Sequence, residues 1–493
     1  MTALILIAGW AGIWLAGYSL ATALCHNSTG RAQRTERLGL ALPLGIAAHS
    51  GAMYAWSWCG GRLTGGTSWT LALLGIMAGV ATLWWTSRRD RVALSEGTVE
   101  GAALARLCQW IVGIVLIGTM VLALLTPQRF WDERAIFGIK SKVLFTDGTI
   151  DSPILADPDF AQGHPRYPLL IPLAETHVYL LLGRIDDRWS KAVFPLLFAG
   201  LVVTFAGVLS RRFGSGTGWL WALLLATLPV LSPYELGFIT GQGDAPVACY
   251  HGLAVLYAWD WLTAAPACRT VGVRHAILIG VVAAAAAFTK DEGIAYLLVG
   301  LIALVLAWCW GWVQIRHQRP TTKNDLRYPW LTLAKFLLIA GGTAAVLLTP
   351  WLAHRRALPT TNEMQYFSRL SADRLSEQIA AVQWMVPHLT SRMFREWSVW
   401  GLQWWLLIAA LITAPIRLSR PAQLFVLLEI LGAIAALVVA GMIAPAELHD
   451  HIGGSSHRYL LQLSPLAVLF AAGQWGGESG EPTADRGRTG TVE

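Results

Sequence analysis

The chain has 493 residues, of which 55% are hydrophobic and only 14% are charged, and its formal net charge is +7. Soluble domains carry roughly 25% charged residues, so this composition excludes an ordinary soluble globular protein and places the chain in the membrane class. Because the basic residues mostly flank apolar segments, the positive charge predicts cytoplasmic loops beside anionic lipid rather than nucleic-acid binding.

The first apolar stretch, residues 2–24, is long enough to cross a bilayer and lacks the basic region and small-residue cleavage site of a signal peptide. We therefore expect a retained transmembrane helix. Applying the rule of about 20 apolar residues per crossing to the whole chain predicts about 13 spans. These expected spans are 2–24, 38–58, 67–86, 108–126, 190–210, 217–233, 245–263, 273–289, 293–313, 331–352, 401–416, 422–443 and 458–475.

The distribution of arginines predicts the orientation of these spans. Arg31, Arg34 and Arg37 follow the first span and a second basic loop follows the third, so both loops are expected in the cytoplasm. The apolar stretch 167–183 is ambiguous, because a full crossing there would place the later basic loops outside. An interfacial or re-entrant helix keeps all of them in the cytoplasm, and Pro168 near its start suits an irregular entry.

The expected fold class is therefore all-α: a polytopic membrane protein with extracytoplasmic interfacial helices. We divide it into N-terminal helices over 1–126, a membrane domain over 127–475 with long outer loops at 127–189 and 353–400, and a disordered cytoplasmic tail at 476–493. The six cysteines are scattered without metal-ligand spacing, so neither a disulfide framework nor a zinc site is expected.

Unusual polar residues gather on the extracytoplasmic side of this topology. Ionisable residues at span ends usually face a cavity or each other, since exposure to hydrocarbon is costly. The pattern indicates a polar cavity at the outer surface; the alternative is a set of ordinary solvated loop charges. The motifs are Trp131-Asp132-Glu133-Arg134, His164-Pro165-Arg166-Tyr167-Pro168, Asp244-Ala245-Pro246, Thr289-Lys290-Asp291-Glu292-Gly293, His354-Arg355-Arg356 and His457-Arg458-Tyr459.

In their order and spacing, these motifs resemble those of the GT-C superfamily of membrane glycosyltransferases. The likeness is strongest to the branch holding the protein O-mannosyltransferases and the lipid A aminoarabinose transferase, and it covers roughly residues 128 to 475. It departs from the family pattern in one respect: the acidic pair follows the fourth span rather than the first, so the N-terminal spans have no counterpart.

The resemblance implies an enzyme that moves a sugar from a polyprenyl-phosphate donor to an acceptor hydroxyl at the extracytoplasmic face of a cell membrane, expected to be the bacterial inner membrane. Asp132 is the expected catalytic base, with Glu133 as the alternative, and Asp244 is expected to orient the acceptor or hold the base. A single base predicts inversion at the anomeric carbon, because retention needs a second carboxylate close by.

Cationic side chains are expected to bind the departing phosphate, since arginine donates two parallel hydrogen bonds and lysine supplies a point charge. The expected phosphate-binding residues are Lys290, Arg355, Arg356 and Arg458, and His164 and Arg166 are assigned to the acceptor entrance. Tyr167 and His457 are further expected substrate-binding residues.

No essential metal is expected. A divalent ion on Glu133, Asp244 and His457 remains the alternative, because carboxylates and imidazole are suitable ligands. The expected partners are the lipid-linked donor, a lipid, glycan or protein acceptor, and membrane lipids.

Two other classes of function stay open. A transporter or lipid flippase also places charges near a cavity, although such proteins tend to show internal repeats and broken helices at the membrane midplane. A non-catalytic scaffold predicts no convergence of Asp132, Asp244 and Lys290. The sequence has no repeat of 20–50 residues, which favours the glycosyltransferase.

Overall fold

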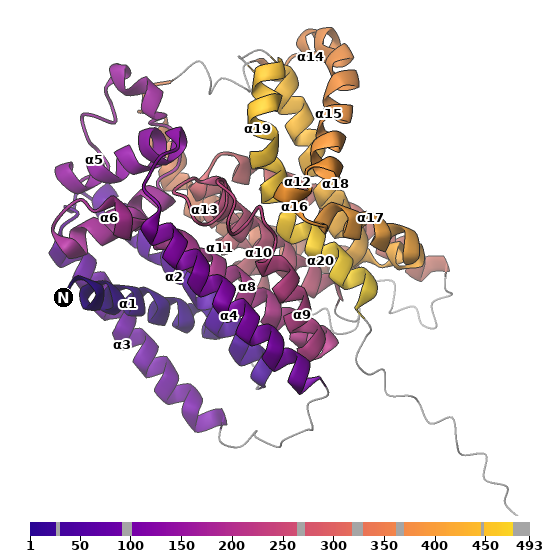
Figure 1. The fold of residues 1–493 in the computed structure, drawn as a ribbon, viewed down its shortest axis with the longest axis horizontal. Coiled ribbons are helices and arrows are strands. Elements are labelled where there is room, and N and C mark those ends of the chain that lie inside the picture. The colour runs from indigo at the N-terminus through magenta and orange to yellow at the C-terminus, as the bar shows by residue number, and fades with distance from the viewer. Residues whose placement is uncertain are drawn as a thin grey trace, which may run out of the picture.

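A computed structural model describes residues 1–25, 30–90, 101–263, 272–317, 329–360, 369–444 and 448–476, and in these residues every regular element is helical (Figure 1). Within the described residues, eight apolar helical stretches are long enough to cross a membrane, which confirms the membrane class. They comprise α1 (Thr2–Leu24), α2 (Arg31–Trp58), α3 (Gly65–Asp90), α4 (Ala102–Leu125), α7 (Asp187–Ser190) with α8 (Val193–Phe213), α12 (Glu292–His317), α13 (Pro329–Arg355) and α18 (Pro421–Ile443).

The remaining helices are shorter or less apolar. Five of the expected spans fall on them, at 217–233, 245–263, 273–289, 401–416 and 458–475. These helices are η1 (Asp132–Gly138), α5 (Ile139–Asp147), η2 (Pro158–Gly163), α6 (Leu170–Leu182), α9 (Ser215–Ala226), α10 (Asp244–Thr263), α11 (Val273–Thr289), α14 (Ala372–Gln378), η7 (Ile379–Ala381), α15 (Val382–Arg395), α16 (Trp397–Trp400), α17 (Gln403–Thr413), η8 (Pro415–Ser419), α19 (Leu448–Gln462) and α20 (Ser464–Trp475).

Two expected spans differ from the structure because proline interrupts them. The expected span 217–233 ends as helix α9 at Ala226, and turns follow it before Pro229 and Pro233. The last expected span, 458–475, is divided between α19 and α20, with Pro465 in the first turn of α20. Proline removes a backbone donor and disfavours helical geometry in the residue before it, so an apolar run need not be one helix.

The ambiguous stretch 167–183 forms α6, which has 13 residues. At 1.5 Å per residue such a helix is roughly 20 Å long, which is shorter than the hydrocarbon core. Its residues Leu170–Leu181 are buried, and it packs against α5, α2 and α3. This length agrees with an interfacial or re-entrant helix rather than a full crossing.

Close helix packing relies on small residues in the N-terminal half. Gly17 of α1 lies against Ala41 of α2, where an added Cβ would come within 1.8 Å of the Ala41 carbonyl oxygen. Gly39 of α2 lies against Thr204 of α8, where a Cβ would come within 2.3 Å of the Thr204 backbone nitrogen. Such contacts let backbones approach closely, as is common between apolar helices.

Because neighbouring helices run in opposite directions, the start of one helix lies beside the end of the next. Helix α10 begins at Asp244, α11 ends at Thr289, α12 begins at Glu292 and α13 ends at Arg355, and α11 packs against the other three. In Figure 1 helices α5, α14, α15 and α19 lie toward the upper edge of the view. The polar residues of the candidate site lie at or near these helix ends.

The expected tail falls almost entirely on residues 477–493, which lie outside the described part of the chain.

Candidate functional site

Four of the residues singled out in the sequence meet in one group, together with Gln462. The Arg458 guanidinium bridges two carboxylates: Nη2 donates to Asp132 Oδ2, and Nε donates to Asp244 Oδ2 at 3.0 Å. Lys290 Nζ donates to Asp244 Oδ1 at 2.7 Å, and Gln462 Nε2 donates to the same oxygen at 2.9 Å. Glu292 Oε1 lies 2.9 Å from Lys290 Nζ. We call these six residues the bridged-acid cluster.

Each member of the bridged-acid cluster stands at or near the end of a helix. Asp132 is the first residue of η1, and Asp244 is the first residue of α10. Lys290 lies between α11 and α12, where two helices are joined with almost no linker. Arg458 and Gln462 are four residues apart on α19 and therefore share one face of that helix.

Asp244 is fully buried and ionised. Burial by itself would raise the pKa of this carboxyl, but the Arg458 and Lys290 cations outweigh burial and hold the pKa well below its usual range. A carboxylate so strongly bound to cations is a poor proton acceptor. Through these contacts Asp244 holds the side chains of Lys290 and Arg458.

Asp132 differs from Asp244 in its access to solvent. Its side chain keeps 13% of its surface exposed, whereas that of Asp244 keeps none. Asp132 begins a π-helical segment, η1, and π-helical turns are often found at functional sites. Asp132 is therefore the carboxylate of the pair that a substrate can reach.

Glu133 does not join the bridged-acid cluster. Its Oε2 accepts from the backbone N–H of Arg129 at 2.9 Å, and its Oε1 accepts from the backbone N–H of Gly241 at 2.8 Å. Lys191 Nζ lies 3.6 Å from Oε1, with both side chains fully buried. Adjacent residues of a helix point in different directions, so Glu133 ties η1 to the loop before α10 while Asp132 faces Arg458.

A second group, the cationic cluster, consists of Lys140, Arg166, Asp291 and Arg355. Arg355 makes a bidentate pair with Asp291, at 2.8 and 2.7 Å, and Arg166 Nε donates to the Arg355 carbonyl oxygen at 3.1 Å. Three of its four side chains are cationic types. Since Asp291 follows Lys290 directly, the two clusters are neighbours along the chain.

Lys140 is the buried member of the cationic cluster. Its Nζ donates to the Tyr167 carbonyl oxygen at 3.2 Å, and the side chain has no exposed surface. Burial lowers the pKa of Lys140 to about 7; Asp291 opposes this shift, and Arg355 adds to it. Lys140 is not among the residues selected from the sequence, because it lies outside the motifs at the span ends.

Among the other predicted residues, Tyr167 lies close enough to Arg458 to interact with it electrostatically, and its carbonyl oxygen accepts from Lys140. The His164 ring stacks on Tyr167 at 4.9 Å, and His164 has a left-handed backbone with φ 48°. Arg356 is exposed at the end of α13. His457 bonds to Glu396 and stacks on Trp400, so it faces α15 and α16 rather than Asp244.

The three residues considered as metal ligands do not converge. Glu133 pairs with Lys191, Asp244 with Lys290 and Arg458, and His457 with Glu396. Within the described part of the chain, no group of three or more His, Cys, Asp and Glu side chains is arranged to hold a metal ion. The side chains of His449 and His451 lie outside that part.

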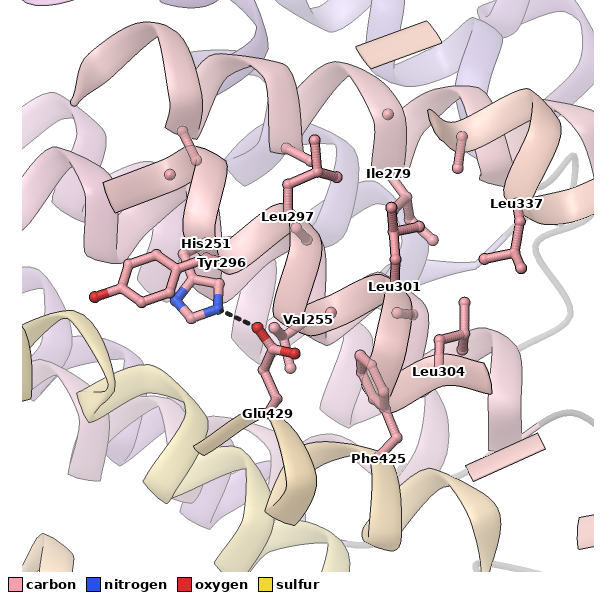
Figure 2. A pocket seen from close by; sticks show the side chains of 18 of the residues that line it. His251, Val255, Ile279, Tyr296, Leu297, Leu301, Leu304, Leu337, Phe425 and Glu429 are labelled. Atoms are coloured by element: carbon pink, nitrogen blue, oxygen red, sulfur yellow. Dashed lines mark hydrogen bonds and ion pairs between the residues drawn. The ribbon is translucent and has the colours of Figure 1, made fainter. Parts of the chain in front are cut away.

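A separate cavity of about 60 Å³ lies among α10, α11, α12, α13 and α18. Figure 2 shows His251 and Glu429 at one end, joined by a 3.0 Å hydrogen bond, with apolar side chains along the rest. Tyr296 stacks on His251 with a centroid separation of 4.2 Å. This pair could not be predicted from the sequence, because a single His and a single Glu in apolar runs about 180 residues apart give no local pattern.

Comparisons with known proteins identify no family. Neither a scan against protein-family models nor searches of curated proteins and of solved structures find a match to the chain.

Proposed function

We propose that the chain is a membrane glycosyltransferase that moves a sugar from a polyprenyl-phosphate donor to an acceptor hydroxyl. The observation that carries the proposal is the bridge from Arg458 to both Asp132 and Asp244, with Lys290 bound to the latter. These residues come from four separated segments and were selected from the sequence for this chemistry. A scaffold gives no reason for them to converge.

Asp132 is the base in this proposal. It is partly accessible, whereas Asp244 is buried and committed to two cations. The acceptor hydroxyl attacks the anomeric carbon, its proton passes to Asp132, and the bond to the lipid phosphate breaks with the electron pair on the phosphate. A single displacement by the acceptor oxygen, on the face opposite the leaving phosphate, gives inversion at the anomeric carbon.

The departing phosphate needs positive charge that acids have not already neutralised. In the bridged-acid cluster Lys290 and Arg458 face three carboxylates, those of Asp132, Asp244 and Glu292. The cationic cluster instead sets Lys140, Arg166 and Arg355 against Asp291. Because Arg355 already pairs with Asp291, Arg166 is the better phosphate ligand of this cluster, and Lys290 and Arg458 organise the acids.

The proposal places the site at the extracytoplasmic face of the cell membrane, the bacterial inner membrane in our interpretation. The orientation rests on the arginine distribution of the sequence. Both clusters lie at one end of α10, α11, α12 and α13, which supports a single active face.

The test is transfer by purified protein in lipid. Wild type and Asp132→Asn are incubated with radiolabelled polyprenyl-phosphate sugars and a membrane extract as the source of acceptor. We expect transfer by wild type and a loss of about 10²-fold or more in Asp132→Asn. Glu377→Gln, which changes an exposed acid on α14, is the matched control and should transfer normally. Equal transfer by all three proteins would remove Asp132 as the base, and no transfer from any donor would contradict the proposal.

One observation favours the alternative, a transporter or flippase. His251 and Glu429 form a buried pair among apolar helices, and ionisable residues inside a membrane often mark a transport path. Uptake of a labelled lipid-linked sugar into sealed vesicles, lost in Glu429→Gln but kept in Asp132→Asn, would support this alternative instead.

A further inference from the structure

A groove of about 460 Å³ opens between the start of η1 and η2, and Trp131, the residue before Asp132, lines it. One wall is formed by Trp131, Arg134 and Ile139 of the segment that enters η1 and α5, and the other by Asp159, Phe160 and Gln162 of η2. Trp131 directly precedes Asp132 in the chain, and η1 packs against η2. A ligand in the groove therefore lies against the start of the helical segment that carries Asp132, although the Asp132 side chain does not itself line the groove.

The lining of the groove combines two aromatic side chains, Trp131 and Phe160, with polar groups that donate and accept hydrogen bonds. The Trp131 side chain is 59% exposed. Arg134 and Gln162 offer donors, Asp159 and Gln162 offer acceptors, and all three residues are exposed. A sugar ring fits this combination, because its C–H face is apolar and its hydroxyls both donate and accept hydrogen bonds.

The charges of the groove argue against an anionic ligand. Arg134 would attract a phosphate, but Asp159 on the opposite wall would repel it. A neutral ligand rich in hydroxyls meets no such conflict. An exposed tryptophan and an arginine could otherwise serve as a membrane-surface anchor, which is the competing interpretation.

We propose that this groove binds the acceptor and that the acceptor is a neutral carbohydrate chain stacked on Trp131. The inference rests on the proposed glycosyltransferase function and narrows its acceptor from lipid, glycan or protein to glycan. With its terminal ring on Trp131, the acceptor presents a hydroxyl to Asp132. That oxygen forms the new bond to the anomeric carbon as its proton passes to Asp132 and the lipid phosphate leaves with the bonding electrons.

Binding can be measured without any donor, which separates this inference from the transfer reaction. Fluorescently labelled neutral oligosaccharides of glucose, mannose, galactose and N-acetylglucosamine are titrated onto the full chain in lipid nanodiscs. We expect at least one to bind wild type, with Kd raised tenfold or more by Trp131→Ala and less by Trp131→Phe, which keeps an aromatic face. Gln162→Ala should raise Kd as well.

Two control variants make the result specific. Trp397→Ala removes a tryptophan of nearly equal exposure, 57%, that does not line the groove, and should leave Kd unchanged. Asp132→Asn should leave oligosaccharide binding within about twofold while transfer is lost, since the base contributes to chemistry rather than to stacking.

The outcomes separate the two proposals. Transfer by wild type with the acceptor KM unchanged in both Trp131→Ala and Gln162→Ala would overturn the glycan groove and leave the enzyme standing. Binding of soluble short-chain phosphatidylglycerol, but of no oligosaccharide, in a Trp131-dependent manner would overturn it in favour of a lipid headgroup site. Trp131-dependent oligosaccharide binding without transfer from any donor would uphold the carbohydrate site and reject the glycosyltransferase.

Discussion

Arg458 Nε donates to Asp244 Oδ2 at 3.0 Å, although 214 positions separate the two residues in the chain. The same guanidinium reaches Asp132, so a single side chain on α19 joins the start of η1 to the start of α10. The planar fork of arginine suits this double contact, since its nitrogens point in fixed directions. The position of Asp132 thus depends on a residue near the far end of the sequence.

Replacing Arg458 with lysine tests whether this position needs only a positive charge or also the planar geometry of the guanidinium. Lys keeps the positive charge but places it at one point, so it cannot bridge both carboxylates as the guanidinium does. We expect the transfer kcat to fall about 10²-fold, because a 1 Å misplacement of reacting groups has an effect of this size. The apparent donor KM should change little. A variant with normal kcat would show that charge is sufficient at this position.

Lys290 and Asp244 should be energetically coupled. Both side chains are buried and lie 2.7 Å apart, and removing one partner of a buried ion pair typically costs about 3–5 kcal/mol. Lys290→Met and Asp244→Asn should each lower the free energy of unfolding by more than half the loss in the double variant. Denaturation of the protein in mixed micelles measures all four values. Additive losses would contradict direct coupling.

Most residues of the bridged-acid cluster could be predicted from the sequence, but Gln462 could not be selected from a motif. Asp132, Asp244, Lys290 and Arg458 were identified from motifs at span ends, where apolar runs stop and charges begin. Gln462 was missed, although its spacing of four from Arg458 on one helix would have revealed it.

The limits of the sequence have two physical causes. Helix length was overestimated where Pro465 interrupts an apolar run, because hydropathy does not register a lost backbone donor. The direction of a side chain could not be predicted from the sequence either. Glu133 adjoins Asp132 but binds the Gly241 backbone, and His457 adjoins Arg458 but binds Glu396. Adjacent positions on a helix diverge, and only tertiary packing decides which one meets a partner.

Glu175 of α6 should make the protein less stable as the pH rises. Burial raises the pKa of this carboxyl from 4.5 to about 8, with the Ser141 hydroxyl bonded to it at 2.5 Å opposing the shift. Between these values the folded state holds a proton that the unfolded state has lost, so stability falls as pH rises.

Glu175→Gln should abolish that dependence. Gln is neutral and close in shape, so the variant should gain stability over wild type across pH 4.5–8, by an amount on the order of a few kcal/mol above pH 8. Melting temperatures at pH 5, 6.5, 8 and 9 test this, with Glu377→Gln as the exposed control. Parallel pH profiles for wild type and Glu175→Gln would contradict the assignment.

Lys140 should make the protein more stable as the pH rises, which is the opposite of the effect of Glu175. Burial lowers its pKa from 10.5 to about 7, so between these values the unfolded state binds the proton that the folded state lacks. The contribution of Lys140 to the free energy of unfolding therefore rises as the pH increases from about 7 to 10.5. Lys140→Met should flatten the rise and, below pH 7, stabilise the protein by an amount on the order of a few kcal/mol. A Met variant that is less stable than wild type at pH 6 would show that the buried amine is held charged.

A pair of glycines on one helix tests how α2 packs. At Gly39 an added Cβ would come within 2.3 Å of the Thr204 backbone nitrogen, whereas at Gly51 no heavy atom lies within 4 Å. Alanine favours helix over glycine by about 1 kcal/mol, so Gly51→Ala should hold or raise the melting temperature. Gly39→Ala should lower it by several degrees, because α2 and α8 must separate. Since both substitutions are identical and lie on the same helix, equal melting temperatures would mean that α2 does not pack against α8 in this way.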